Sequence, residues 1–230
     1  MGLLLIIGLA TWWGAPGRGR ATPTGEAGPP FSVVPAPAGS GDTAILVTHF
    51  ANYAGSQLGY NVAGRLAEAL QREIEGARLD IQVMVWPEAV GERRQALAAG
   101  RASKATLVIY GEYDVGRVVV QFAHPDNGQI FADPAVQRYV TNVQELSTTL
   151  NSDLPEQVRS LALLALGQIY LHRSDVEQAR PLLLQARDTL KNNRAVDDRT
   201  RAVVDFYLGV AFQYSQPPAL DEAIRAYTGA

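Results

Sequence analysis

The stretch Thr43-Ala44-Ile45-Leu46-Val47-Thr48-His49-Phe50 decides how this sequence folds, because it is a short and almost uninterrupted apolar run. Gly41-Asp42 precedes it and Asn52 follows it closely. An apolar run of this length between turn-forming residues predicts a buried β-strand.

Helix and strand patterns alternate after this first strand. Asn61 is placed to cap a helix whose apolar residues recur at helical spacing, Pro87 ends the next strand, and residues 114–117 form a tight turn. The order predicts an α/β fold class, with a small, mostly parallel sheet that is flanked by helices and ends in an antiparallel hairpin. The predicted elements are a helix over 61–76, a strand over 79–86, a helix over 88–103, and strands over 106–113 and 118–122.

The composition excludes several classes of function. Of the 230 residues, 47% are hydrophobic and 19% charged, so the chain can bury a core. The net charge is −3 and no stretch is strongly basic, which argues against nucleic acid as a partner. The absence of cysteine excludes disulfides, zinc–thiolate sites, iron–sulfur clusters and thiol catalysis.

The loop after the first strand is where an enzyme of this architecture would carry its chemistry. Residues 51–60 contain two glycines, but they lack the Lys-Ser/Thr ending of a P-loop and the G-x-G-x-x-G spacing. No serine, histidine and acid gather near the predicted strand ends. We therefore predict no enzyme activity, no catalytic or cofactor-binding residue and no metal site. The alternative is a small-molecule-sensing, nucleotide-binding or hydrolytic α/β domain that uses the Asn52–Tyr60 loop.

Residues 1–17 form an apolar N-terminal segment without a charged side chain. We interpret the segment as a membrane anchor or a signal-like sequence, with Trp12 and Trp13 at the membrane interface. Arg18 and Arg20 would then keep the rest of the chain in the cytoplasm by the positive-inside rule, although the side of the membrane stays open.

Residues 18–42 are rich in proline and glycine, which predicts an extended linker without a helix or a central strand. Within this linker, the side chains suited to docking on another surface are Phe31, Val33 and Val34.

Two motifs in residues 43–125 resemble a known family. They are Val47-Thr48-His49-Phe50-Ala51-Asn52 with Leu58 and Arg65-Leu66-Ala67-Glu68-Ala69-Leu70, and the stretch from Ala98 to Tyr113 that contains Thr106-Leu107-Val108-Ile109-Tyr110-Gly111. They resemble the amino-terminal α/β domain of TolB and its relatives in bacterial envelope and regulatory proteins, although His49 stands where that family would have proline. The resemblance implies an accessory domain without catalysis, often placed before helical repeats.

Residues 126–156 are a predicted connector, in which 138–152 fit a helix or a strand equally well. Residues 157–230 then follow a helical pattern, with helices over 157–171 and 176–190. Ser174 and Glu177 have the spacing of a capping box for the second helix.

Residues 157–230 resemble tetratricopeptide (TPR) repeats in two copies, and we expect the second copy to be truncated. The two glycines of the pattern are 42 residues apart, against ~34 in the repeat family. We expect Gly167 and Ala179 to let two helices approach closely, and Tyr170 and Leu183 to fill the space between neighbouring hairpins. The TPR packing signature comprises Leu163, Leu166, Gly167, Tyr170, Ala179, Leu183, Ala186, Leu208, Gly209, Phe212, Ala223, Tyr227 and Ala230.

The TPR resemblance also implies a concave groove for a partner polypeptide. We therefore expect a non-enzymatic scaffold for protein–protein interaction, with possible self-association through its C-terminal repeat. The alternative for the apolar groove positions is that they pack against the preceding element. The positions are Leu164, Gln168 and His172 in the first copy, and Phe206, Val210, Gln213 and Tyr214 in the second.

Overall fold

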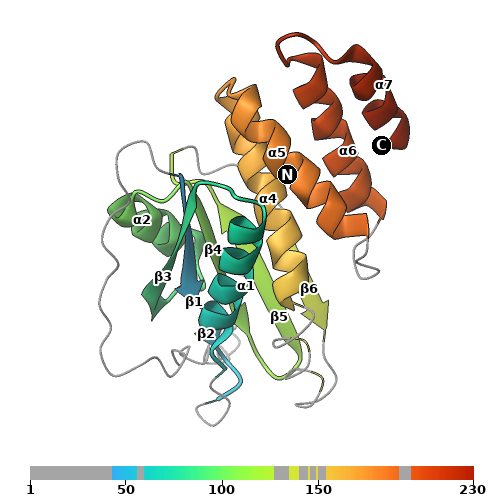
Figure 1. The fold of residues 1–230 in the computed structure, drawn as a ribbon. Coiled ribbons are helices and arrows are strands. Elements are labelled where there is room, and N and C mark those ends of the chain that lie inside the picture. Colours follow the sequence, from blue (N-terminus) through green and yellow to red (C-terminus); the bar gives the residue numbers. More distant parts are fainter. Residues whose placement is uncertain are drawn as a thin grey trace, which may run out of the picture.

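The computed structural model describes residues 43–55, 60–126, 135–139, 145, 149, 154–191 and 198–230. In these residues a sheet with flanking helices is followed by a helical C-terminal part (Figure 1). The elements are β1 (Thr43–His49), β2 (Ala51–Asn52), α1 (Val62–Gly76), β3 (Ile81–Ala89), α2 (Arg93–Ser103), β4 (Leu107–Tyr113), β5 (Arg117–Ala123), β6 (Ala135–Tyr139), α4 (Leu154–His172), α5 (Val176–Lys191), α6 (Asp198–Gln213) and α7 (Leu220–Gly229).

The sheet has the strand order β3-β1-β4-β5-β6, and the short β2 pairs with β4. Strand β1 lies parallel to both β3 and β4, whereas β4 and β5 form an antiparallel hairpin that β6 extends. The predicted fold class, a small sheet flanked by helices and followed by an all-helical segment, is therefore confirmed.

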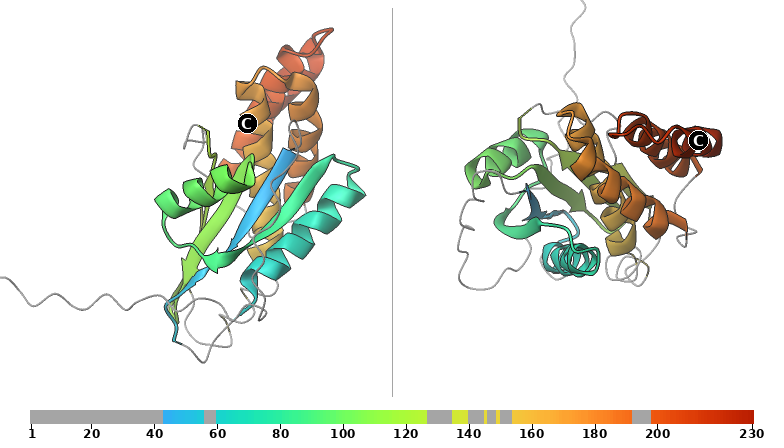
Figure 2. Two further views of the ribbon diagram at one scale, coloured as in Figure 1. Left: turned by 90° about the vertical axis from the view of Figure 1, so that its left-hand side faces the viewer. Right: turned by 45° about the horizontal axis from the view of Figure 1, so that its top comes forward.

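Helices cover both faces of the sheet (Figure 2). Alternate residues of each strand point to opposite faces, so Ile45 and Val47 of β1 join a core with α1 and α4, whereas Ala44 and Leu46 join a smaller core with α2. The first of these cores continues through α5, α6 and α7 without a break, so the sheet and the helical part share one hydrophobic interior.

Helix α4 is the element that belongs to both parts of the molecule. It packs against α1 and strands β4, β5 and β6 on one side and against α5 on the other. Its side chains are buried almost all round, including Leu154, Val158, Leu163 and Ile169. The first helix of the predicted repeat segment is thus also a covering helix of the sheet.

Two predicted boundaries are wrong around Pro87. Strand β3 does not end there but continues to Ala89, which pairs with His49 after a register shift. Helix α2 accordingly begins at Arg93 and not at Glu88. A proline without an N–H is tolerated in β3 because the strand lies at the edge of the sheet.

The predicted N-cap of α1 is confirmed, whereas the predicted N-cap of α5 is wrong. Asn61 caps α1 as expected, since its Oδ1 accepts a hydrogen bond of 3.0 Å from the Gly64 N–H. The capping box at Ser174 is wrong: Asp175 caps α5, with its Oδ1 accepting from the Gln178 N–H at 3.2 Å. Ser174 instead has a left-handed φ of 60° and ends α4.

No helix in the described residues is long and apolar enough to cross a membrane. The predicted anchor at 1–17 and the linker at 18–42 lie outside the described residues.

Candidate functional site

Polar groups at the described ends of the loop after β1 bond to each other and to β4. The Asn52 Oδ1 accepts a hydrogen bond of 2.8 Å from the Ala54 N–H, and the Tyr60 N–H donates to the Tyr113 hydroxyl at 3.2 Å. The rings of Tyr60 and Tyr113 also meet edge to face at 6.0 Å. These contacts fix the described ends of the loop. The stretch 56–59 lies outside the described residues.

The three histidines come from three different elements, and the charge of His172 acts on His124. His49 ends β1 and is buried, His124 follows β5 and is buried, and His172 ends α4 and is exposed. Across the described ranges, no three His, Asp or Glu side chains gather in a way that could hold a metal ion.

His124 connects the sheet to the turn between α4 and α5. Its Nδ1 donates a hydrogen bond of 2.8 Å to the Thr106 carbonyl, and its Nε2 lies 3.9 Å from a carboxylate oxygen of Asp126. That carboxylate also pairs with Arg173 at 3.0 Å. Burial lowers the pKa of His124 below its ordinary value of 6.5, although the Thr106 carbonyl and Asp126 act in the opposite direction.

The groove positions expected on α4 are not available to a partner. Leu164 and Gln168 are 2% and 1% exposed, because α4 packs between the sheet and α5. The expectation that they line an open groove is wrong, and Leu164 is instead a member of the main hydrophobic core. His172, at the end of α4, is exposed.

The groove positions on α6 lie on an open surface, which we call the α6–α7 face. Phe206 is 50% exposed and Tyr214 64%, with Gln213 exposed and Val210 half-buried beside them. Helix α7 adds three further exposed apolar side chains, namely Leu220, Ile224 and Tyr227, at 58%, 63% and 37%. The ring of Phe206 contacts that of Tyr227 at 5.9 Å, so the two helices contribute to one surface.

The TPR packing signature is placed mostly in the interior. Tyr170 and Leu183 have partners outside the predicted pattern: the Tyr170 hydroxyl reaches Thr43 at the start of β1, and Leu183 packs against Gly167 inside its own hairpin. Ala230, the last signature position, is exposed. The buried members are Leu163, Leu166, Gly167, Ala179, Leu183, Ala186, Leu208, Gly209 and Ala223, and Phe212 is half-buried.

A polar cluster joins α1 to the helical part. Glu73 of α1 pairs with Arg159 of α4 at 3.1 Å and accepts hydrogen bonds from Gln185 and Thr189 of α5. The side chains of Glu73 and Arg159 are 13% and 29% exposed. The cluster therefore stabilises the contact between α1 and the first hairpin.

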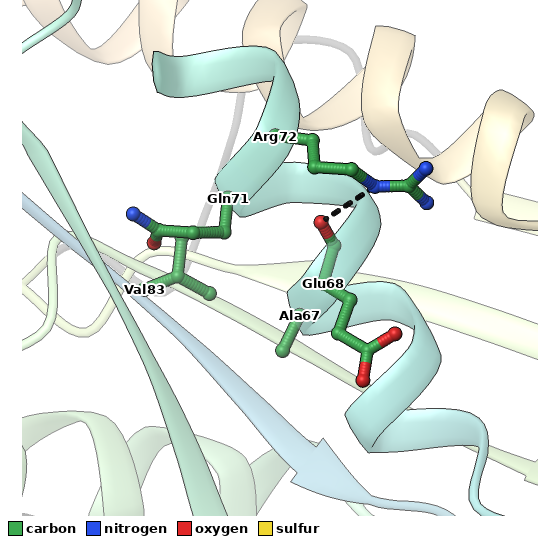
Figure 3. Close-up of a pocket in the computed structure, with 5 residues that line it drawn as sticks. All are labelled: Ala67, Glu68, Gln71, Arg72 and Val83. Carbon is green, nitrogen blue, oxygen red and sulfur yellow. Dashed lines mark hydrogen bonds between the residues drawn. The ribbon is translucent and has the colours of Figure 1, made fainter.

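A shallow groove of about 500 Å³ opens between α1 and β3 (Figure 3). Ala67 and Val83 are its apolar lining residues, and the other three are Gln71 on the β3 side of α1 and Glu68 and Arg72, whose side chains point to the other side of the helix. Arg72 donates to the backbone carbonyl of Glu68 at 3.4 Å and points away from the Glu68 carboxylate. This groove is not predicted by a sequence motif; its sequence signal is the run of small and polar side chains at the helical spacing of 67, 68, 71 and 72.

Comparison with known proteins yields a distant likeness to a solved structure. No protein-family model matches the chain, and no curated protein matches it either. Among solved structures, a PelC dodecamer from Paraburkholderia phytofirmans is similar, with 20% identity and a TM-score of 0.33 over 54% of this chain and 91% of the PelC chain. No conclusion about function follows from a likeness of this extent.

Proposed function

We propose that this chain is a non-enzymatic scaffold for protein–protein interaction, in which TPR-like hairpins bind a partner polypeptide and the α/β part is an accessory unit. The observation that supports the proposal is the α6–α7 face. Phe206, Tyr214, Leu220, Ile224 and Tyr227 are all more than a third exposed on two adjacent helices.

Exposed apolar side chains that gather on one surface are typical of interaction sites, because burying them against a partner removes apolar area from water. Phenylalanine and tyrosine are favoured at such sites, since they offer a large contact area at a small loss of conformational freedom. The chemistry of the face fits a partner with apolar side chains, such as one side of an amphipathic helix. A second copy of this chain, bound through the same face, is the self-associating form of this proposal.

The proposal includes an anchor. Residues 1–17 would hold the scaffold at a membrane, with 18–42 as the spacer between the anchor and β1. Under the positive-inside rule, Arg18 and Arg20 place the scaffold on the cytoplasmic side.

The test compares Phe206→Ser and Ile224→Ser with Val115→Ser. Val115 is 55% exposed in the turn between β4 and β5, so it is a matched control of similar exposure outside the face. A partner identified by crosslinking to the full-length chain is purified, and its Kd is measured for each variant. We expect a loss of tenfold or more in affinity, about 1.4 kcal/mol, for each substitution in the face and none for Val115→Ser.

Sedimentation of the same variants tests the self-associating form. The self-associating form would be supported if the unchanged chain self-associates, Ile224→Ser abolishes this association and Val115→Ser does not affect it. Equal binding and equal association in all three variants would contradict the proposed function. The small-molecule alternative would be favoured by a ligand that binds saturably and raises the melting temperature of the chain, if substitution of Tyr53 or Tyr60 abolishes its binding.

A further inference from the structure

Strand β3 has a free edge in the part of the chain that the structure describes. It stands at the end of the strand order and pairs with β1 on its other side. Its residues 81–86 are Ile-Gln-Val-Met-Val-Trp and carry no charge, whereas Pro87 and Glu88 come only at its end. Long, uncharged strand edges pair with other chains, and proteins usually cover them or protect them with charges. Residues 81–86 therefore offer backbone N–H and C=O groups with which an added strand can pair.

We propose that Phe31-Ser32-Val33-Val34 adds an antiparallel strand to the free edge of β3, with Phe31 and Val33 seated over the groove between α1 and β3. These residues include the three large apolar side chains of 18–42, and Pro30 and Pro35 bound them. Prolines at both ends limit a strand to a short edge segment, since they cannot donate to the ladder. The proposal does not depend on the proposed function of the α6–α7 face.

The length of the chain before β1 permits this pairing and sets its direction. Thr43 pairs with Ile81, so β1 and β3 begin at the same end of the sheet. The eight residues 35–42 can span at most ~28 Å, and two strand spacings measure ~10 Å. A short connection of this kind joins strands that run antiparallel, whereas a parallel strand needs a crossover of about a dozen residues or more.

The groove supplies a place for the side chains of the added strand. Val83 is half-buried and points to the α1 side of the sheet, where it and Ala67 are the apolar lining residues of the groove. Alternate residues of a strand lie on the same face, so Phe31 and Val33 would lie on this side together. Val34 would then lie on the opposite face, where Trp86 is half-buried.

The test uses the absence of cysteine, which makes any introduced pair unique. Val83→Cys is combined in turn with Phe31→Cys, Ser32→Cys, Val33→Cys and Val34→Cys in the full-length chain. The rate of intramolecular disulfide formation under mild oxidation is measured by intact mass. Thr24→Cys with Val83→Cys is the control, because residue 24 lies in the same segment but outside the proposed strand.

We expect an alternating pattern, because a disulfide needs Cβ atoms ~3.5–4.5 Å apart and only one face of the strand meets this condition. The pairs with residues 31 and 33 should react about tenfold faster than those with residues 32, 34 and 24. Rates that change smoothly along the segment would overturn the proposal. Disulfides between two chains in place of intramolecular ones would overturn it as well, and would assign the edge to a second copy.

Amide hydrogen exchange gives a second measurement that needs no disulfide. The double variant Phe31→Asp/Val33→Asp should expose the outer edge, so amides within 81–86 should exchange about tenfold faster than in the unchanged chain. The double variant Thr22→Asp/Thr24→Asp adds the same charge outside the strand and should leave them unchanged. Equal exchange in all three proteins would overturn the proposal.

Discussion

The side chain of Leu183 occupies the space that Gly167 leaves beside its backbone. A methyl group on Gly167 would come within 2.6 Å of the Leu183 Cγ and Cδ2 atoms. Gly209 and Tyr227 repeat this relationship in the next hairpin, where a methyl group would lie 2.4 Å from the Tyr227 ring. In both hairpins a large side chain of the second helix therefore packs against a glycine of the first helix. This contact brings the two helix axes close together.

Gly167→Ala should destabilise the protein more than Gly209→Ala. Leu183 is fully buried and cannot move aside, whereas Tyr227 is 37% exposed and can rotate toward water. Overpacking of this kind typically costs ~1–3 kcal/mol, which exceeds the ~1 kcal/mol that alanine gains over glycine in a helix. The free energy of unfolding from urea titrations measures the difference.

Gly76→Ala is the control for this comparison, since no atom lies within 4 Å of a methyl group there. It should be neutral or stabilising by up to ~1 kcal/mol. Equal losses at all three glycines would contradict the packing argument.

The turn between α4 and α5 should respond in opposite ways to two neighbouring substitutions. Ser174→Gly should stabilise the protein by ~0.5–1 kcal/mol, because glycine adopts the left-handed φ of 60° without steric cost. Asp175→Ala removes the side-chain cap of α5 and should cost ~1 kcal/mol. Thermal unfolding of both variants checks the assignment, and a loss at Ser174 without a loss at Asp175 would restore the capping box that the sequence suggested.

The stability of the protein should fall as the pH drops below about 6.5, the ordinary pKa of histidine. Burial lowers the pKa of His49, and it lowers that of His124 against the Thr106 carbonyl and Asp126, while Arg173 and His172 also act to lower the pKa of His124. The unfolded chain therefore binds protons at a higher pH than the folded chain does. Stability is lost from about pH 6.5 down to the folded pKa and changes no further through these groups below it.

His124→Asn should reduce this acid-side loss, because an amide nitrogen at the same position can still donate to Thr106 but does not titrate. Unfolding free energies at about pH 7 and pH 5 give the slope. His172→Asn removes one of the charges that lower the pKa of His124, so it should reduce the acid-side loss in the same direction but by less than His124→Asn does. An unaltered slope in His124→Asn would mean that His124 takes no part in the pH dependence.

Glu73→Ala should weaken the contact between α1 and the first hairpin. It leaves Arg159 and Gln185 without the carboxylate that both contact in a largely buried cluster, at an expected cost of ~1–3 kcal/mol. Asp188→Ala removes a pair with Lys191 whose side chains are 57% and 61% exposed, and it should cost less than ~0.5 kcal/mol. Chemical denaturation compares the two, and similar losses would show that the cluster has no special role.

The sequence predicts elements well where local signals agree. Helix α1 follows from Asn61 and a regular spacing of apolar residues, and its end at Gly76 is as expected. Strand β4 and its turn to β5 follow from an apolar run and from Asp114, whose Oδ1 accepts from the Gly116 and Arg117 N–H groups. In each case the stabilising contacts lie within a few residues of one another.

The sequence predicts less well which element covers which. The apolar pattern of α4 shows that the helix is buried, but not that its groove positions Leu164 and Gln168 would be buried in the interior. The nearly continuous apolar run over 161–171 was a signal, because a helix that is apolar all round has neighbours on all sides. Strand β3 continues beyond Pro87 because an edge strand tolerates proline. Its edge position follows from the strand order of the sheet, which the residues next to the proline do not reveal.

Because α4 packs against both the sheet and the next helix of the hairpin, the sheet and the hairpins form one folding unit. A fragment that ended after β5 would lack α4. The apolar side of its sheet, which includes Ile109 and Val120, would then be exposed to water where α4 covers it in the full chain. In a fragment that began at α4, the apolar residues of α4 that pack against the sheet would be exposed to water. A unit that folds alone has its own closed interior, so the helical hairpins should fold only together with the sheet, and a chimaera that transplants them should include residues 43–230.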